Sequence, residues 1–464
     1  MKKQAYNPYL PLWEYIPDGE PYVFDGRVYV YGSHDLYNDC VFCSGDYMGW
    51  SAPVDDLSDW RCEGVIFPRM GDPANDGRMN LYAPDVTKGP DGRYYLYYVY
   101  DKVGFVSVAV GDSPAGRFRF LGYVRYKDGT RLGDRAGDEP QFDPGVLTEG
   151  DRTFLYTGFC GRGDKSRHGS FCTVLGPDML TIEEEPVLAA PGCMYAEGTG
   201  FEGHAFFEAS SIRKRGELYY FVYSSEVMHE LCWATARDPR GPFTYGGVLI
   251  SNCDLGSDAG KPADRPLAYG GNNHGSIVEI AGQWYVFYHR QTNGTWFSRQ
   301  GCAEPIFFDE DGRIAQVRMT SCGLNGGPLR GEGDHPAAVA CHLFGPEKSL
   351  YAGAGQPRIA RSGPEDRGDG WIAGLSEGCT AGWRYFDCKG VTSVSVVTRG
   401  YGHGAFLVRT EPDGPVLGRI PCESSNVWER HSAPVPFPDG RQALYLTWEG
   451  GGSLQLSAIG FGRE

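Results

Sequence analysis

The 464-residue sequence contains no run of 18 consecutive apolar residues, which excludes a membrane-spanning helix and predicts that the protein has no membrane partner. Basic residues are few beside acidic ones, 43 against 59, and the formal net charge is −16. This charge has the wrong sign for binding a phosphate backbone, so nucleic acid is excluded as a partner. A neutral or cationic small molecule fits better. The sequence does not indicate an oligomeric state.

An apolar secretion signal is also missing. Lys2 and Lys3 imitate the basic start of such a signal, but prolines interrupt the following residues and no apolar stretch forms. We therefore expect a cytoplasmic protein whose fourteen cysteines are mostly small buried residues rather than a disulfide framework. Cys40 and Cys43 have the spacing of a redox or zinc half-site, but no second pair stands at zinc spacing.

Glycine, with 67 residues, and aromatic side chains, with 14% of the chain, are abundant. They recur in one repeated pattern: an ionisable residue, an apolar strand, a glycine turn and a strand rich in Tyr and Phe. The copies begin at Asp18, Asp85, Asp143, Glu208 and His274, at intervals of 67, 58, 65 and 66 residues. In each copy the turn glycine follows the leading residue by seven or eight positions, at 26, 92, 150, 216 and 282.

Alternation such as Val28-Tyr29-Val30-Tyr31 predicts short strands in every copy, and no long helical pattern is present. Periodic all-β units with a glycine and aromatic residues in each unit are typical of a β-propeller. We predict an all-β chain with a five-bladed propeller over residues 1–329, a linker over 330–338 and a jelly-roll-like β-sandwich over 339–464.

In a propeller the innermost strands line a shared axis, so the five leading residues are expected to converge at one mouth. Four carboxylates and an imidazole in one funnel form a chemical constellation. The alternative is that these Asp and Glu residues only begin strands by accepting hydrogen bonds from turn amides, and Asp143-Pro144 suits that structural role as well as a functional one.

Four segments spread over residues 7–325 resemble glycoside hydrolase family 43, which comprises five-bladed propellers that cleave arabinan and xylan-type sugars. They are Ile16-Pro17-Asp18 with its following hairpin, Tyr82-Ala83-Pro84-Asp85-Val86, Glu208-Ala209-Ser210-Ser211-Ile212, and Asn273-His274-Gly275-Ser276. The resemblance implies that Asp18 is the general base, Glu208 the general acid and Asp85 the carboxylate that tunes the acid. Gly19 and Ala209 depart from the usual proline and glycine of the family.

The resemblance also implies that His274 is an axial histidine beside water or calcium and that Arg290 faces the sugar. No cofactor is expected to be required. A structural calcium at His274 would take most of its ligands from water, because this ion prefers six to eight oxygens. Trp13 and Phe207 are candidates for stacking on a sugar ring, with packing inside a blade as the alternative.

We therefore expect an inverting exo-glycosidase that releases α-L-arabinofuranosyl or β-D-xylosyl units from oligosaccharides derived from plant polysaccharides. The alternatives are an exo-galactosidase, a fructosidase suggested by Arg237-Asp238-Pro239, and a propeller that binds carbohydrate without cleaving it. Gly382-Trp383-Arg384-Tyr385-Phe386-Asp387 resembles a family 6 carbohydrate-binding module. For a cytoplasmic enzyme we favour a structural role for this part, by packing on the propeller or shaping its mouth.

Overall fold

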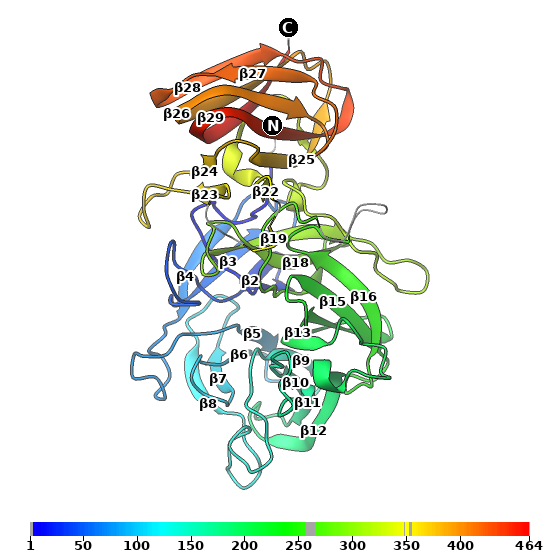
Figure 1. Ribbon diagram of the computed structural model, residues 1–464. Helices are drawn as coiled ribbons and strands as arrows, with labels where there is room; N and C mark the ends of the chain where they lie inside the picture. Colours follow the sequence, from blue (N-terminus) through cyan, green and yellow to red (C-terminus); the bar gives the residue numbers. More distant parts are fainter. Residues whose placement is uncertain (1–2, 257–264, 348, 352–354, 464) are drawn as a thin grey trace.

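The computed structural model describes residues 3–256, 265–347, 349–351 and 355–463, which form a propeller and a second β-unit stacked on it (Figure 1). In this part of the chain the helices are three single 3₁₀ turns, η1 (Cys193–Tyr195), η2 (Gly323–Asn325) and η3 (Ala337–Val339). None of the described helices is long and apolar enough to cross a membrane. The predicted all-β class is therefore confirmed.

The five predicted blades are five antiparallel sheets in chain order, the first four with four strands and the fifth with three. The first sheet comprises β1 (Glu20–Phe24), β2 (Arg27–Tyr31), β3 (Tyr47–Pro53) and β4 (Arg61–Phe67). The second comprises β5 (Asp85–Lys88), β6 (Tyr94–Tyr98), β7 (Ser107–Gly111) and β8 (Arg119–Tyr123), and the third β9 (Gly145–Glu149), β10 (Arg152–Thr157), β11 (Gly169–Leu175) and β12 (Ile182–Pro191). The fourth comprises β13 (Phe206–Arg215), β14 (Leu218–Ser225), β15 (Glu230–Ala236) and β16 (Thr244–Ser251), and the fifth β17 (Ile277–Ile280), β18 (Gln283–Gln291) and β19 (Arg299–Ile306).

The innermost strands lie next to one another around the axis: β5 beside β9, β9 beside β13, and β17 beside β1. A parallel bridge between Gly19 and Gly275 joins the first blade to the last. The N-terminal segment packs against the fifth blade, where the Tyr9 N–H donates to the Gly301 carbonyl at 3.2 Å. The start of the chain thus closes the ring beside β19.

The hairpin loops at the inner edge differ in length. Two residues connect the inner hairpins of blades one, three, four and five. In blade two, Lys88 pairs with Tyr94, so the β5–β6 loop contains the five residues 89–93. Gly92 therefore does not occupy the same place in its blade as the other turn glycines. Because of the longer loop, residues of β5 do not occupy the positions that the repeated sequence pattern assigns to them in the other blades.

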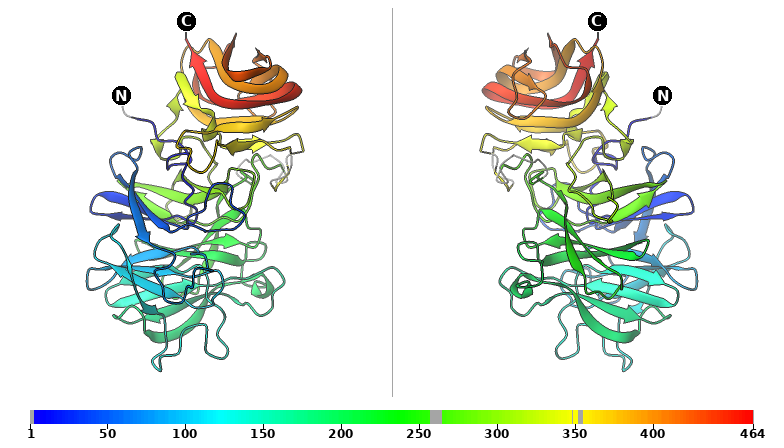
Figure 2. Two further views of the ribbon diagram at one scale, coloured as in Figure 1. Left: turned by 90° about the vertical axis from the view of Figure 1, so that its left-hand side faces the viewer. Right: turned by 90° about the vertical axis from the view of Figure 1, so that its right-hand side faces the viewer.

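The C-terminal unit is one ten-stranded sheet that curls over its own core, above the propeller in Figure 2. Its long strands β26 (Ser393–Arg409) and β29 (Gly440–Gly462) pair along most of their length. The predicted sandwich is thus a single curled sheet. The other strands are β20 (Leu329–Arg330), β21 (Gly333–Pro336), β22 (His342–Phe344), β23 (Arg358–Ala360), β24 (Trp371–Leu375), β25 (Thr380–Cys388), β27 (Gly418–Cys422) and β28 (Ser425–Pro434).

Residues 330–338, which the composition predicts to be a linker, instead belong to this sheet. They contain part of β20, all of β21 and the start of η3, and β21 pairs with β29. Leu12, from the N-terminal segment, is buried in the same apolar core as Trp383 and Trp448. The propeller and the C-terminal sheet therefore share a hydrophobic core instead of being tethered by a free connection.

A buried ion cluster reinforces this joint. Asp254, which follows β16, accepts hydrogen bonds from Arg384 at 2.7 Å and from His342 Nε2 at 3.2 Å. Burial would raise the pKa of Asp254, but His342 and Arg384 lower it to about 2. Burial, together with Arg384, lowers the pKa of His342 to about 4, so the histidine is neutral and its Nε2–H donates to the carboxylate.

These contacts predict the effect of removing the sheet. A chain that ends at Pro328 would expose Leu12 and remove the hydrogen bonds that Arg384 and His342 donate to Asp254, and both changes are destabilising. We expect this truncated chain to be insoluble, or to unfold at a clearly lower temperature than the full chain in differential scanning calorimetry. A truncated propeller with the melting temperature of the full chain would contradict this interpretation.

Candidate active site

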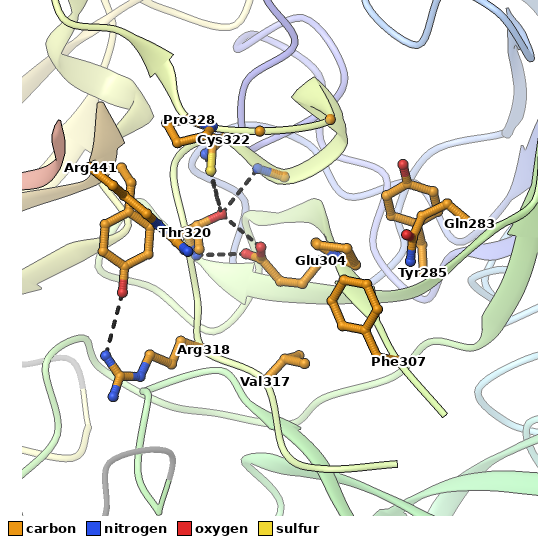
Figure 3. A pocket seen from close by; sticks show the side chains of 15 residues that line it. Gln283, Tyr285, Glu304, Phe307, Val317, Arg318, Thr320, Cys322, Pro328 and Arg441 are labelled. Carbon is orange, nitrogen blue, oxygen red and sulfur yellow. Dashed lines mark hydrogen bonds between the residues drawn. The ribbon is translucent and has the colours of Figure 1, made fainter. Parts of the chain in front are cut away.

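Two cavities need to be distinguished, and the first lies where the propeller meets the C-terminal sheet, with a volume of about 390 Å³ (Figure 3). Among the described residues that line it, Glu304 is the only acidic one. Its Oε1 accepts from the Thr320 N–H at 2.6 Å and its Oε2 from the Thr320 hydroxyl at 2.7 Å. Burial raises the pKa of Glu304 to about 8. A single carboxyl that is already hydrogen-bonded supports the joint and does not provide an acid–base pair.

The second cavity lies at the mouth of the propeller axis and has a volume of about 450 Å³, which is typical of small-molecule sites. Its ionisable lining combines carboxylates with cationic side chains: Asp18, Asp143, Glu208, His274 and Arg299. Its walls are rich in aromatic rings: Phe42, Tyr82, Phe142, Phe159, Phe207, Trp296 and Phe297. Apolar walls around a few convergent charges are the usual form of a binding and catalytic pocket.

Unusual backbone geometry directs the carboxylates into this pocket. Asp18 and Asp143, each just before an inner strand, have positive φ values of 58° and 42°. A β-bulge interrupts the pairing of β13 around Glu208, and the next residue, Ala209, has φ 68°. The Ala209 N–H donates to Asp143 Oδ2 at 3.2 Å, which couples blades three and four. Left-handed conformations of non-glycine residues carry strain and are concentrated at functional sites.

Asp18 is held as a carboxylate. Its Oδ1 accepts from Arg299 Nη1 at 2.9 Å and lies 3.1 Å from His289 Nδ1. Burial would raise the pKa of Asp18, but the Arg299 guanidinium and then the His274 imidazolium hold it well below the usual range. Because His289 Nε2 donates to the Asn272 carbonyl at 2.8 Å, the neutral imidazole accepts the Asp18 N–H at Nδ1, at 3.2 Å.

Arg299 is fixed by a second carboxylate. Its Nε and Nη2 donate to the two oxygens of Asp35 at 2.8 and 3.0 Å, a bidentate pair, while Nη1 remains directed at Asp18. Asp35, His289 and Arg299 are site residues that the sequence did not predict. Asp35 and His289 lie within the segments that carry the family resemblance, near the ends of Asp25–Asp35 and Trp284–Arg290, whereas Arg299 is outside every repeated motif.

Glu208 has the opposite protonation behaviour. Burial and then the negative charge of Asp143 raise its pKa to about 8, despite the nearby His274. The pKa of Asp143 is itself raised, first by burial, although its contact with His274 opposes that shift. At neutral pH, Glu208 is therefore a carboxylic acid while Asp18 is a carboxylate.

His274 lies between the carboxylates on the axis. Its Nδ1 is 3.5 Å from Asp143 Oδ2 and 4.0 Å from Asp18 Oδ1, and its Nε2 is 3.9 Å from Glu20 Oε1. Burial would lower the pKa of His274, but Asp143, Asp18 and Glu20 raise it to about 9. The imidazole is therefore protonated at neutral pH and balances part of the negative charge of the pocket.

Asp85, predicted to stand at the mouth and to tune Glu208, does not line this pocket. Its oxygens accept from the Val146 and Val86 N–H groups, both at 2.7 Å, and from the Tyr22 hydroxyl at 2.8 Å. Burial and then Glu20 raise its pKa to about 8. The carboxylate beside Glu208 is Asp143 instead.

The longer β5–β6 loop explains this correction. Counting back seven residues from the first residue of the inner hairpin loop leads to Asp18 in blade one, Asp143 in blade three and His274 in blade five. The same count in blade two leads to Tyr82, which does line the pocket. Asp85 lies deeper along the axis, beneath the mouth.

Two other predicted contacts also lie elsewhere. Side chains alternate along β18, so Arg290 points away from the face on which His289 meets Asp18, and its Nη2 donates to the Ala340 carbonyl at 3.2 Å. Trp13 packs on Trp50 with ring centres 5.9 Å apart and does not line the pocket. Phe207 does line it.

The surroundings of His274 do not fit a calcium ion. Its Nε2 faces Glu20 Oε1, a buried oxygen with no hydrogen-bond partner among the described residues. The other oxygen of Glu20 accepts from Arg213 Nη2 at 2.6 Å and from the Ser211 hydroxyl at 3.1 Å. One free carboxylate oxygen is far short of a calcium shell, and a guanidinium already occupies the same carboxylate.

The arrangement has a definite chemical capacity. The carboxylate of Asp18 and the carboxylic acid of Glu208 face one pocket with aromatic walls. Their different surroundings lower the pKa of Asp18 and raise that of Glu208. Such a pair can activate water on one side of a substrate and protonate a leaving oxygen on the other.

Comparisons with known proteins agree with this capacity. The family model described as Glycosyl hydrolases family 43 matches residues 25–314. A xylosidase/arabinosidase of Thermoclostridium stercorarium is 62% identical over 468 residues, which cover 99% of each chain.

Solved structures match as well. A β-xylosidase/α-arabinofuranosidase from a compost microbial metagenome, in complex with xylotriose and described as a calcium-free form, is 26% identical, with a TM-score of 0.53 over 68% of this chain and 98% of that one. An arabinoxylan arabinofuranohydrolase of Bacillus subtilis, in complex with cellotetraose, covers 99% of this chain and 97% of its own at 21% identity and a TM-score of 0.53. The second match shows that the complete two-part fold occurs elsewhere.

Proposed function

This chain belongs to family 43 of the glycosyl hydrolases, and we propose that it is an inverting exo-glycosidase that removes α-L-arabinofuranosyl or β-D-xylosyl units from arabinoxylan-type oligosaccharides. The observation that carries this proposal is the opposite protonation of Asp18 and Glu208 in one pocket. The name of the relative that is 62% identical supports the sugar class.

In the proposed reaction, ionised Asp18 accepts a proton from water as the water attacks the anomeric carbon. Protonated Glu208 gives its proton to the glycosidic oxygen, and the leaving sugar departs as an alcohol. Arg299 keeps Asp18 ionised, whereas burial and then the charge of Asp143 keep Glu208 protonated. Phe207 and the other aromatic walls are suited to stacking on the sugar ring.

The placement of the pair supports inversion. Asp18 precedes the inner strand of blade one and Glu208 lies on that of blade four, so the two carboxyl groups approach the axis from non-adjacent blades. Wide separation leaves room for a water molecule between the base and the sugar, whereas retaining enzymes need the two groups only about 5–5.5 Å apart.

The substrate is best assigned by direct assay. Turnover of the 4-nitrophenyl glycosides of arabinofuranose, xylose and galactose, together with xylo- and arabino-oligosaccharides, separates the proposed activity from an exo-galactosidase. No turnover of any arabinosyl or xylosyl substrate would contradict the proposal.

We also propose a cytoplasmic location and a structural role for the C-terminal sheet. All fourteen cysteines are free thiols, which supports a reducing compartment. The shared core and the Asp254 cluster support a sheet that holds the propeller together. Activity found in the medium rather than in lysed cells would contradict the location.

Glu208→Gln tests the role of the acid. We expect kcat/KM on unactivated oligosaccharides to fall by about 10²–10⁴-fold, because their leaving alcohol needs a proton. The loss should be small on 2,4-dinitrophenyl glycosides, whose leaving group departs unprotonated. Asp18→Asn should abolish turnover of both, because water still has to be activated. Equal losses on both substrates in Glu208→Gln would contradict the assignment.

Asp143→Asn tests which carboxylate tunes the acid. Wild-type kcat/KM should decline above about pH 8, where Glu208 loses its proton. Removing the charge of Asp143 lowers the pKa of Glu208, so the alkaline limb should move to lower pH by about one unit. Asp85→Asn is the matched control and should leave the limb nearly in place. The reverse pattern would restore the role predicted for Asp85.

Proton NMR of the first sugar released tests the stereochemistry. We expect an anomeric configuration opposite to that of the substrate, before mutarotation mixes the two forms. Initial product with the configuration of the substrate would show a covalent intermediate and exclude Asp18 as a base for water.

A further inference from the structure

A second layer of charge lies beneath the pocket on the propeller axis. Glu20 on β1 faces the underside of His274, and Arg213 on β13 binds Glu20 from the other side at 2.6 Å. Both side chains are almost entirely buried, at 1% and 10% exposed. Asp85, hydrogen-bonded to Tyr22, completes this layer.

The contacts of Arg213 hold its guanidinium in one place. Nη1 donates to the Ile212 carbonyl at 2.7 Å, Nη2 also donates to the Pro21 carbonyl at 3.2 Å, and the charge lies over the Tyr22 ring at 4.2 Å from its centre. A buried cation with this many directed contacts is a fixed positive charge on the axis.

That charge lies against the Glu20 carboxylate, beneath a cluster of buried negative charge. His274 alone faces three carboxylates, those of Asp18, Asp143 and Glu20. A buried carboxylate without a cationic partner costs several kcal/mol, so Glu20 needs a counter-ion. One structural neighbour is described as a calcium-free form. In this chain the cation that faces Glu20 is the Arg213 side chain.

We propose that Arg213 is the built-in cation of the propeller axis, which positions Glu20 beneath His274 and makes activity independent of a divalent metal ion. Arg213 is a positioning residue: it acts on the site through Glu20 and His274 and touches no substrate. The proposal rests on the proposed hydrolase function only for its activity readout.

Removing the guanidinium should create a place for a metal. In Arg213→Ala, the Glu20 carboxylate, the Ser211 hydroxyl and the carbonyls of Ile212 and Pro21 would surround the vacated space with oxygens, the ligands that Ca²⁺ prefers. Calcium should therefore change the activity and melting temperature of Arg213→Ala but not those of the wild type. Arg213→Lys keeps a positive charge and should not.

The test compares four proteins, wild type, Arg213→Ala, Arg213→Lys and Arg384→Ala, each treated with EDTA and then with millimolar CaCl₂. The last variant removes a buried arginine from the Asp254 cluster, away from the axis. Activity is measured as kcat/KM on the aryl glycoside that the wild type hydrolyses, and calcium binding as the shift in melting temperature.

We expect the wild type to keep its kcat/KM and melting temperature in EDTA. Arg213→Ala should lose about 100-fold in kcat/KM, because displaced charge beneath the site misplaces the catalytic groups, and calcium should restore about tenfold and raise the melting temperature. Arg213→Lys should retain most activity without calcium. Arg384→Ala should be less stable yet show no calcium response.

Three results would overturn the proposal. The first is wild-type activity that is lost in EDTA and regained with calcium, and the second is Arg213→Ala with the kcat/KM of the wild type. The third is an inactive Arg213→Ala that calcium does not restore, together with an inactive Arg213→Lys. If Arg213→Ala does not fold, Arg213→Lys and wild type in EDTA still decide the question. A wild type inactive on every glycoside would contradict the proposed function, while a calcium-induced rise in its melting temperature would contradict this proposal independently.

Discussion

Buried negative charge on the propeller axis is the constraint on which the rest of the site depends. Asp18, Asp143, Glu208 and Glu20 are each less than a tenth exposed, and their mutual repulsion in a medium of low polarity is costly. The structure meets this cost in two ways. Cations at Arg299, His274 and Arg213 neutralise some carboxylates, and a proton neutralises Glu208. In the proposed reaction the ionised carboxylate, Asp18, is the base and the protonated one, Glu208, is the acid.

The repeated architecture makes this crowding possible, and local departures from the repeat make it useful. Equivalent inner strands bring one residue from each blade to the mouth, which places like charges together. The bulge at Glu208 and the positive φ values at Asp18 and Asp143 then aim individual side chains. The Ala209 N–H bonded to Asp143 shows that this geometry also connects neighbouring blades. At Asp18 and Asp143 this strained backbone geometry falls on residues of the pocket.

The fold was largely predictable because the repeat is a local signal: strand alternation and turn glycines recur in every blade. The site was predictable only in part. Asp18, Glu208 and His274 lead their blades and do reach the pocket, but Asp85 was displaced by a longer hairpin loop whose register is set by strand pairing. Arg299 and Arg290 lie on neighbouring strands without a repeated motif, and only the pairing of β18 with β19 decides which of them faces Asp18. The ordering of residues 330–338 depends on β29, over a hundred residues away, and composition carries no information on such a partner.

The central claim is that Glu208 is protonated and Asp18 ionised in the same pocket at neutral pH. Neutron diffraction from a deuterium-exchanged crystal at pH 7 measures this directly. The account predicts deuterium on a carboxyl oxygen of Glu208 and on both nitrogens of His274, and none on Asp18. Deuterium on Asp18 with a bare Glu208 carboxylate would contradict it.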